Sequence, residues 1–351
     1  MKGIFKISRI VSFILVLILA LGMFAGCGQQ NAQAPQSAGT STAAGTAVQS
    51  GASQSADTTG ANTAETRYPL TLTDAKNAQV TIPQKPAKIV SMPLGTSEML
   101  LSLVDKSAIA AMTYYVDDPN VSNVTDEAKG VGQRLDANAE KIIALQPDLV
   151  FMDTWTDEGI IKQLRDAKIN VMVLNVPSNI DQEKEMLKTL GEITGETAKA
   201  EAVIDQMDQK LKEISDKLAG LKEDQKLSML DYSEMASTSG KGTNFDDIVT
   251  RAGLVNPVSK DGLEGWPQLS KEMVVKYNPD IISLPSWYYD SKNSFDSLTK
   301  TIKGDKALAG VKAVKNNRLI AVPYNHISTT SQYSVLAVED MAKAAYPELF
   351  K

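Results

Sequence analysis

The feature that most constrains how this chain can fold is a short phrase that it contains twice. "EKIIALQPDLV" begins at Glu140 and "EMVVKYNPDII" begins at Glu272, 132 positions later. Each copy has a glutamate, an apolar helical stretch, a Pro-Asp pair and a strand-like apolar run. Because proline lacks a backbone N–H and disfavours helix at the residue before it, each helix should end there, and a buried parallel strand should follow. The repeat therefore predicts two related α/β units.

All three tryptophans of the chain hold positions related to this repeat. Trp155 and Trp287 each follow the glutamate of their copy by fifteen positions, and Trp266 precedes Glu272 by six, where the first copy has Arg134. Trp155 and Trp287 then fall just beyond the carboxyl end of a predicted strand, at the rim where open α/β sheets bind ligands. We therefore predict that the tryptophans line a cleft between two lobes. The alternative is that they are large core or interface residues.

Strand-like and helical patterns alternate along the rest of the body. Residues 71–82 predict a hairpin with Asn77 near its turn, and apolar runs at 88–92, 148–152 and 169–175 predict strands separated by helices. Such alternation is typical of parallel strands covered by helices.

Between the two copies lies a stretch of different character. From Gly195 to Leu221, apolar residues recur at intervals of four and three, as on one face of a long amphipathic helix. We predict that this helix connects two lobes; the alternative is a surface helix of one larger domain. The predicted fold is α/β, with two Rossmann-like lobes joined by one long α-helix and a ligand cleft between the lobes. The predicted divisions are a signal peptide at 1–26, a lipidated cysteine with a flexible tether at 27–66, an N-terminal lobe at 67–194, the connecting helix at 195–222 and a C-terminal lobe at 223–351.

The first 26 residues have the features of an export signal. Lys2, Lys6 and Arg9 precede an apolar run from Ile10 to Phe24, without any acidic residue. The run leads to Cys27, the only cysteine, within a Phe-Ala-Gly-Cys sequence that resembles a bacterial lipobox. We predict that Cys27 is lipidated and that the chain is exported and anchored to the outer face of the cytoplasmic membrane. The alternative is an ordinary secretory signal with an incidental thiol.

The composition of the following segment predicts a tether. Residues 28–66 consist mainly of Gln, Ala, Ser, Thr and Gly, which cannot bury enough apolar surface to offset the entropy of ordering. Removal of residues 1–26 takes away three basic residues and changes the net charge from −6 to −9. An acidic body argues against nucleic acid as a partner and against binding to an anionic membrane surface.

Taken together, these features resemble the iron-siderophore, haem and cobalamin branch of the solute-binding proteins of ABC importers, the class with a helical backbone. "VGQRLDANAEKIIALQPDLVFMD" at 131–153 is similar to the first-lobe segment of that family, and "GWPQLSKEMVVKYNPDII" at 265–282 is similar to its cobalamin-binding members. The resemblance covers the chain from about Arg67 to its end. It implies delivery of a metal chelate to an importer and no enzyme activity.

The resemblance also implies a reason for the repeat. Members of the family present one glutamate from each lobe to arginines of a permease dimer, and the matching positions are Glu140 and Glu272. Two similar lobes on a monomer thereby dock on a partner with twofold symmetry, and Glu–Arg contacts orient the encounter. The alternative is that each glutamate only suits a helix N-terminus, where the helix dipole favours negative charge.

The predicted ligand is a bulky metal chelate, such as a corrinoid, haem or a ferric siderophore. We predict no intrinsic cofactor and no protein metal site, because His326 is the sole histidine and no acidic cluster has ligand spacing. His326 and Met92 are candidates for an axial contact to the metal, although ordinary hydrogen bonding and packing are the alternatives. For a catecholate siderophore, only Arg134 and Lys241 are available as cationic partners. The predicted ligand-binding residues are Tyr114, Arg134, Trp155, Tyr232, Trp266, Trp287, Tyr288 and His326.

Two other classes of function remain as alternatives. A ligand-sensing partner of a membrane receptor would require the same binding and docking surfaces. An exported hydrolase would depend on His326 alone as its base, and the chain has no G-x-S-x-G before a helix. Nucleotide binding is not indicated, because the sequence has neither a Walker loop nor G-x-G-x-x-G.

Overall fold

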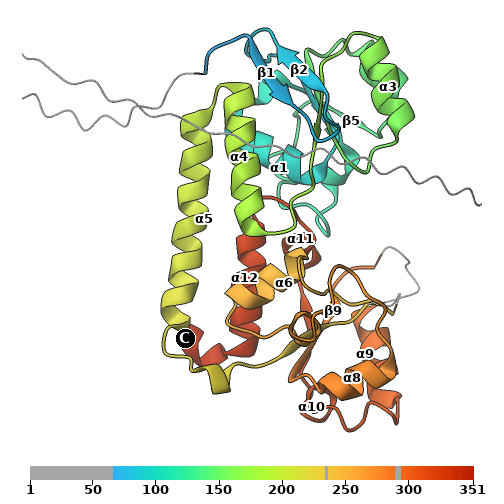
Figure 1. Cartoon of the computed structure of the whole chain (residues 1–351), viewed down its shortest axis with the longest axis vertical. Helices are drawn as coiled ribbons and strands as arrows, with labels where there is room; N and C mark the ends of the chain where they lie inside the picture. The colour runs from blue at the N-terminus through green and yellow to red at the C-terminus, as the bar shows by residue number, and fades with distance from the viewer. Residues whose placement is uncertain (1–65, 234–235, 289–293) are drawn as a thin grey trace, which may run out of the picture. The chain divides into compact units, whose positions relative to one another are not determined.

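The computed structural model of the chain describes residues 66–233, 236–288 and 294–351 (Figure 1). The predicted signal peptide, the lipidation site at Cys27 and nearly all of the predicted tether lie outside these residues. The described residues belong to one compact unit, Gly60–Lys351. No helix in the described ranges has the length and apolar character that a membrane crossing requires.

A parallel sheet forms the centre of the N-terminal lobe. Its strand order is β5-β4-β3-β6-β7, and every neighbouring pair is parallel. The strands are β3 (Ile89–Ser91), β4 (Ile109–Thr113), β5 (Gln133–Leu135), β6 (Leu149–Asp153) and β7 (Val171–Leu174). The helices of this lobe are α1 (Leu94–Leu103), α2 (Ala139–Ala144), α3 (Glu158–Asp166) and α4 (Ile180–Thr194), with short 3-10 turns at Lys106–Ala108 and Tyr114–Asp117.

Both faces of this sheet are covered by apolar side chains. Along β6, Leu149 and Phe151 join one core cluster, whereas Val150 and Met152 join another. Successive strand residues point to opposite faces, so a strand covered on both sides reads as a continuous apolar run. This explains why the run at 148–152 predicted the strand correctly. β5, which has only three residues, had no counterpart among the predicted strands.

The predicted hairpin before the first lobe is present. β1 (Leu70–Thr73) pairs antiparallel with β2 (Gln79–Ile82), and Asn77 lies in the turn with a φ of 61°. Asparagine tolerates this left-handed conformation better than most residues.

The C-terminal lobe has a smaller parallel sheet, in the order β10-β9-β8. Its strands are β8 (Met229–Asp231), β9 (Ile281–Pro285) and β10 (Leu319–Val322). Its helices are α6 (Asn244–Arg251), α7 (Pro257–Lys260), α8 (Lys271–Tyr277), α9 (Phe295–Gly304), α10 (Lys312–Lys315), α11 (Tyr324–Ile327) and α12 (Ser334–Ala345), with 3-10 turns at Glu223–Gln225 and Pro347–Phe350. The observed architecture is therefore the predicted pair of α/β lobes.

The duplicated phrase adopts the same local structure in both lobes. α2 and α8 end as predicted before the prolines, where Gln146 and Asn278 have φ values of 49° and 43°. The aspartate of each Pro-Asp pair then accepts hydrogen bonds from residues just before the neighbouring strand. Asp148 accepts hydrogen bonds from the backbone N–H groups of 87 and 88, just before β3, and Asp280 accepts them from the N–H and hydroxyl of Ser228, just before β8. The phrase thus encodes a helix end, a turn and a strand anchor together.

The long helix predicted at 195–222 is α5, which spans Thr197–Leu218. It is not a lone connector, because α4 lies antiparallel beside it and α12 packs against it as well (Figure 1). Gly195, with a φ of 67°, forms the turn between α4 and α5. Gly191 allows the two helices to approach closely, since a Cβ there would lie 2.7 Å from the Cβ of Ala200. The amphipathic pattern of α5 indicated a buried face but not these partners.

One apolar core contains residues of both lobes and of the helices that join them. It contains Phe151 of β6, Leu187 of α4, Met207 of α5, Ile248 of α6 and Met341 of α12, all at most 2% exposed. Because protein interiors are close-packed, changes of shape in such a core are costly. The lobes are therefore held by a packed helical layer rather than by a single flexible segment.

A buried carboxyl group ties the segment before α12 to the N-terminal lobe. Glu98 of α1 is fully buried and accepts hydrogen bonds from the hydroxyl groups of Thr329, at 2.6 Å, and Ser331. Ser328 and Thr330, the residues on either side of Thr329, line the cavity described next. Glu98 thus fixes a part of the cavity wall that comes from the other end of the chain.

Candidate ligand-binding site

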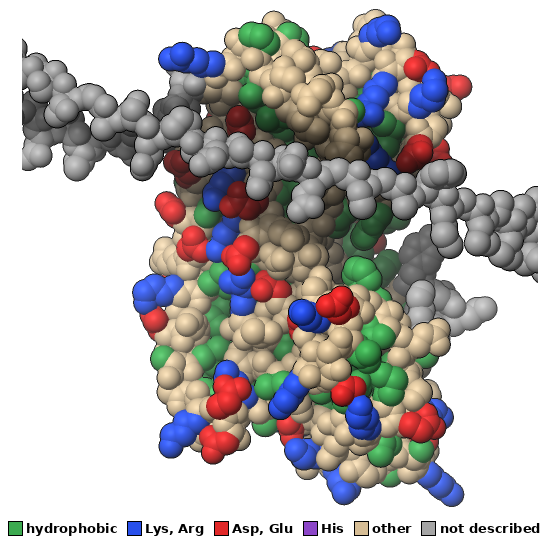
Figure 2. All heavy atoms as spheres, in the orientation of Figure 1, with side chains coloured by type: hydrophobic (Ala, Val, Ile, Leu, Met, Phe, Trp, Pro, Cys, Tyr) green, Lys and Arg blue, Asp and Glu red, His purple; other side chains and the backbone are tan. Residues whose placement is uncertain are grey.

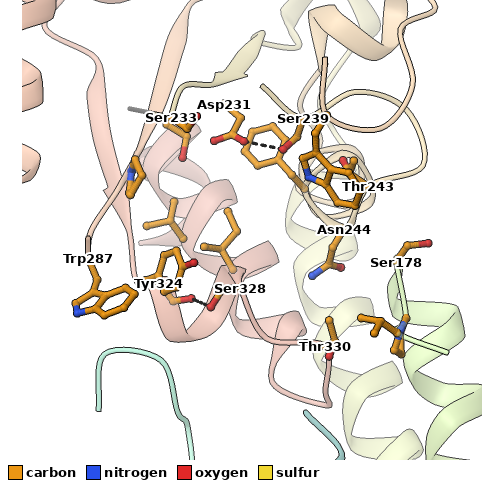
Figure 3. Close-up of a pocket in the computed structure, with 18 of the residues that line it drawn as sticks. Ser178, Asp231, Ser233, Ser239, Thr243, Asn244, Trp287, Tyr324, Ser328 and Thr330 are labelled. Atoms are coloured by element: carbon orange, nitrogen blue, oxygen red, sulfur yellow. Dashed lines mark hydrogen bonds between the residues drawn. The ribbon is translucent and has the colours of Figure 1, made fainter. Parts of the chain in front are cut away.

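A cavity of about 670 Å³ lies where the carboxyl ends of strands from both lobes meet. The N-terminal lobe contributes Thr154 and Trp155 after β6 and the segment 175–178 after β7. The C-terminal lobe contributes the ends of β8, β9 and β10, the first residues of α6 and the segment around Ser328 (Figure 3). This is the predicted location for a ligand in an open α/β fold. Its volume is that of a typical small-molecule pocket.

All three tryptophans line the cavity, as their positions in the repeat predicted. Trp155 is 77% exposed and Trp266 is 69% exposed, so neither belongs to a hydrophobic core. The ring of Trp287 packs against that of Tyr324 with 5.3 Å between the ring centroids. Tyr288 also lines the cavity. Exposed indole rings around a cavity offer a ligand broad apolar faces.

The turn that carries Trp155 is stabilised by the residue that ends β6. Asp153 Oδ1 accepts hydrogen bonds from the backbone N–H of Trp155 at 3.0 Å and from the N–H and hydroxyl of Thr156. An aspartate that bonds to its own backbone two residues later is a common device for ending a strand in a turn. It holds the indole at the cavity edge without burying it.

Polar groups gather at one end of the cavity. Asp231, the last residue of β8, lies near Ser233 and Ser239 in Figure 3, and its carboxylate accepts a hydrogen bond from the Ser239 hydroxyl at 2.6 Å. Burial raises the pKa of Asp231 to about 6, against hydrogen bonds from Ser239 and the backbone of Tyr232, which lower it. Asn244 donates from Nδ2 to the carbonyl of Thr329 at 3.1 Å, while its buried Oδ1 has no hydrogen-bond partner among the described residues.

A second, smaller cavity of about 200 Å³ adjoins the first. The two share Trp155, the segment 175–177, Ser328 and Thr330. The second cavity is also lined by the first turn of α1, from Leu94 to Thr96. The shared residues make the two cavities parts of one recess between the lobes.

The two repeat glutamates occupy equivalent exposed positions. Glu140 is in the first turn of α2, which Asn138 caps, and Glu272 is in the first turn of α8, which Ser270 caps. The pKa of Glu272 lies below its usual value because its own backbone N–H and the Ser270 hydroxyl donate hydrogen bonds to its carboxylate. α2 packs against α3, and Figure 1 shows α3 and α8 on the side of the unit away from α5.

Four of the predicted ligand-binding residues are not among those that line the cavity. Arg134 is bound to Asp117 at 2.8 Å and donates to the carbonyls of residues 128 and 131, so its guanidinium holds a loop together. Tyr114 stacks on Tyr115 with 4.2 Å between ring centroids, outside the lining. These residues have local structural roles that their sequence positions did not indicate.

The remaining two also have other neighbours. Tyr232 packs against the core of the C-terminal lobe. His326 Nδ1 lies 2.6 Å from Asp340 Oδ2, a contact within the C-terminal segment. Met92, the other candidate for an axial contact, packs against the core of the N-terminal lobe. Across the described residues, no three His, Cys, Asp or Glu side chains gather in a way that could hold a metal ion.

Sequence reasoning missed the polar residues of the cavity. Asp231 and Asn175 come directly at or after the end of a strand, the position at which Trp155 was predicted to face a ligand. The same rule applied to every strand would have identified them. Thr330 carried no comparable signal, because it reaches the cavity from a loop near the end of the chain.

Surface charge on the described residues is mixed. Figure 2 shows acidic and basic side chains interspersed over the face in view, with apolar side chains exposed on the C-terminal lobe. Many of the charges pair locally, as Lys212 does with Asp216 and Lys276 with Asp261. Isolated exposed pairs of this kind contribute little to stability, on the order of 0–1 kcal/mol each.

Comparison with known proteins agrees with this architecture. A family described as periplasmic binding protein matches residues 89–325. An uncharacterized ABC transporter substrate-binding lipoprotein of Bacillus subtilis, YvrC, is 28% identical over 293 residues, covering 81% of this chain and 88% of its own. A cobalamin-binding protein of Halobacterium salinarum is 25% identical over 280 residues, covering 79% of this chain and 73% of its own. Among solved structures, a possible iron-binding periplasmic solute-binding protein of Staphylococcus epidermidis has a TM-score of 0.66 at 22% identity, covering 75% of this chain and 100% of that one.

Proposed function

The chain belongs to the periplasmic binding protein family, and on that premise we propose that it is a lipid-anchored extracytoplasmic receptor that delivers a metal chelate to an ABC importer. The observation that carries the proposal is the cavity of about 670 Å³ at the meeting strand ends of two lobes, bordered by three tryptophans. The relatives named above, a substrate-binding lipoprotein and a cobalamin-binding protein, support the transport role and the class of ligand.

A bulky chelate suits this cavity better than a bare ion. Trp155 and Trp266 expose most of their surface, which a flat or rounded apolar ligand would cover. The serine, threonine and asparagine side chains of the lining supply the few directional contacts that fix a ligand's orientation. A chelator brings its own metal ligands, so the protein needs to provide only surface and hydrogen bonds. We propose that Trp155, Trp266, Trp287 and Tyr288 bind it.

Docking on the permease is assigned to Glu140 and Glu272. Their equivalent positions, each in the first turn of an exposed and capped helix, support a role that a partner with twofold symmetry would require twice. Arginines of such a partner would form charge-assisted hydrogen bonds to the two carboxylates. Lipidation of Cys27 and a tether to residue 66 would keep the body near the membrane, where its permease lies.

Titration of the detergent-solubilised full chain tests the proposal. Tryptophan fluorescence and the absorption spectrum of the chelate are followed during addition of cyanocobalamin, haemin and several ferric siderophores. We expect saturable quenching with at least one of these compounds at micromolar concentration or below, because the indoles border the cavity. Failure of every compound to quench or to co-elute with the protein in gel filtration would contradict a chelate-binding function.

A further inference from the structure

The charge of the cavity lining restricts which chelates it can take. Among the described lining residues there is no lysine, arginine or histidine, and the one acidic side chain is that of Asp231. The cationic residues considered from sequence are engaged elsewhere, Arg134 with Asp117 and Lys241 with Glu264. An anion entering this cavity would lose hydration without gaining a cationic partner from the described lining.

Asp231 has unused capacity to accept hydrogen bonds. A carboxylate can accept about four, and two are supplied, one by the Ser239 hydroxyl at 2.6 Å and one by the backbone N–H of Tyr232. Two other acidic residues of this lobe are committed to other partners. Asp246 of α6 accepts from Asn256 and Ser259, and Asp280 before β9 accepts from Ser228 and Lys312. Asp231 is therefore available to a ligand in the cavity.

Asn244 lines the same cavity. Its Nδ2 is used by the carbonyl of Thr329, which fixes the orientation of the amide. The Oδ1 atom is buried and has no hydrogen-bond partner among the described residues. Because this oxygen has no accessible surface, it is closed to a ligand in the cavity, and Asp231 remains the acceptor that a ligand can reach. Figure 3 shows Asp231 and Asn244 in the wall of the same cavity.

We propose that Asp231 forms a subsite for N–H donors, and that the cavity selects chelates that carry amide or ammonium groups and no net negative charge. This inference rests on the proposed function and narrows its substrate class. Two sources share this chemistry: the peripheral amides of a corrinoid and the ammonium group of a hydroxamate siderophore. Anionic chelates, such as ferric catecholates, fall outside it.

The experiment compares ligands that differ in charge at a single position. Ferrioxamine B carries an ammonium group, its N-acetyl derivative is neutral and its N-succinyl derivative is anionic, with the same iron chelate in all three. For corrinoids, cyanocobalamin is compared with a monocarboxylic acid in which one peripheral amide has been hydrolysed. Dissociation constants are measured at pH 7.5 for the wild-type full chain, Asp231→Asn and Asp296→Asn, the last being an exposed charge removed from the same lobe.

We expect at least one of the two series to bind, with the anionic member at least about tenfold weaker than its partner of more positive charge. The Asp231→Asn variant can still accept a hydrogen bond from Ser239. In this variant the ratio of the two dissociation constants should fall several-fold, whereas Asp296→Asn should leave the ratio unchanged. Thermal unfolding of both variants reports that the fold is retained.

Outcomes separate this inference from the function on which it rests. Tight binding of the anionic members or of a ferric catecholate would overturn the charge selection and leave the receptor function intact. If the ratio of dissociation constants between the anionic and the more positive ligand were unchanged in Asp231→Asn, Asp231 would not be part of the subsite. If chelates of every charge failed to bind, the proposed function would fall and the inference with it.

Discussion

In the N-terminal lobe, Asn138 caps the helix that carries Glu140, and Asp148 anchors the first strand of the sheet. In the C-terminal lobe, Ser270 and Asp280 do the same around Glu272. Apart from Trp155 and Trp287, which hold equivalent positions of the repeat, the cavity lining does not repeat in this way. Its N-terminal part is an indole and a short segment after β7, whereas the C-terminal lobe supplies most of the lining, including the carboxylate.

The difference separates two kinds of recognition. Features present in both lobes suit a partner that presents the same surface twice, since an interface with twofold symmetry needs each contact in duplicate. Features present in one lobe suit a ligand without that symmetry. The experiments below treat the two sets separately, in order of decreasing expected effect.

Removal of both repeated carboxylates should have the largest effect. We expect Glu140→Ala with Glu272→Ala to lower uptake of the cognate chelate by at least about tenfold, because each lobe would lose the charge-assisted contact proposed for it. Ligand affinity should remain within about twofold. Uptake is measured with labelled chelate in cells that carry the variant in place of the wild-type chain.

The matched control is Glu201→Ala with Glu213→Ala, which removes the same charge from exposed positions of α5. Its uptake should equal that of the wild type. A parallel loss of ligand affinity in the Glu140 and Glu272 variant would show that the two glutamates do not act only in docking.

The tryptophans contributed by different lobes should have a smaller effect. We expect Trp155→Ala and Trp266→Ala each to weaken chelate binding by roughly tenfold, the effect of losing on the order of 1–2 kcal/mol of apolar and ring contact. Because both indoles are largely exposed in the free protein, the midpoint of thermal unfolding should hardly change. Isothermal titration and differential scanning calorimetry provide the two measurements.

Trp266→Phe should recover part of the lost affinity, since a smaller ring remains at the same place. Unchanged affinity in either alanine variant would take that indole out of the binding surface. A loss confined to one lobe would show that the ligand rests mainly on that lobe.

The smallest expected effect concerns the helical layer that joins the lobes. Glu183 of α4 is buried, accepts a hydrogen bond from Ser334 of α12 at 2.6 Å and has no partner for Oε2 among the described residues. Burial raises the pKa of Glu183 well above its ordinary value. The protonated form therefore favours the folded state, and this stabilisation is present below about pH 4.5 and is lost as pH rises through the folded-state pKa.

Glu183→Gln removes the ionisable group and keeps an acceptor for Ser334. We expect its free energy of unfolding, relative to that of the wild type, to increase as pH rises from about 4.5 to 8. Urea denaturation at several pH values measures the difference. Glu185→Gln, at an exposed position of the same helix, should show no such trend, and a constant difference for Glu183→Gln would argue against the raised pKa.

Local rules account for what could be predicted. A helix that stops before proline, a strand of continuous apolar residues and a hairpin around Asn77 depend on nearest neighbours, so their positions follow from short windows of sequence. Because the repeat places Trp155 and Trp287 at strand ends, the general topology of parallel sheets was enough to bring them to the cavity. Arg134 occupies a repeat-related position too, but its partner Asp117 lies seventeen residues away, and no local sequence pattern indicates this ion pair.

By itself, the sequence determined the number and kind of lobes, the long helix and the paired glutamates, because duplication and periodicity depend only on the order of the residues. Only the tertiary structure decided which polar groups meet in the cavity and which helices support α5. Asn175, Asp231 and Thr330 belong to three distant segments, and their convergence depends on how two sheets and the helices α4, α5 and α12 pack together. Packing is a property of the whole core, so no local spacing in the sequence can specify it.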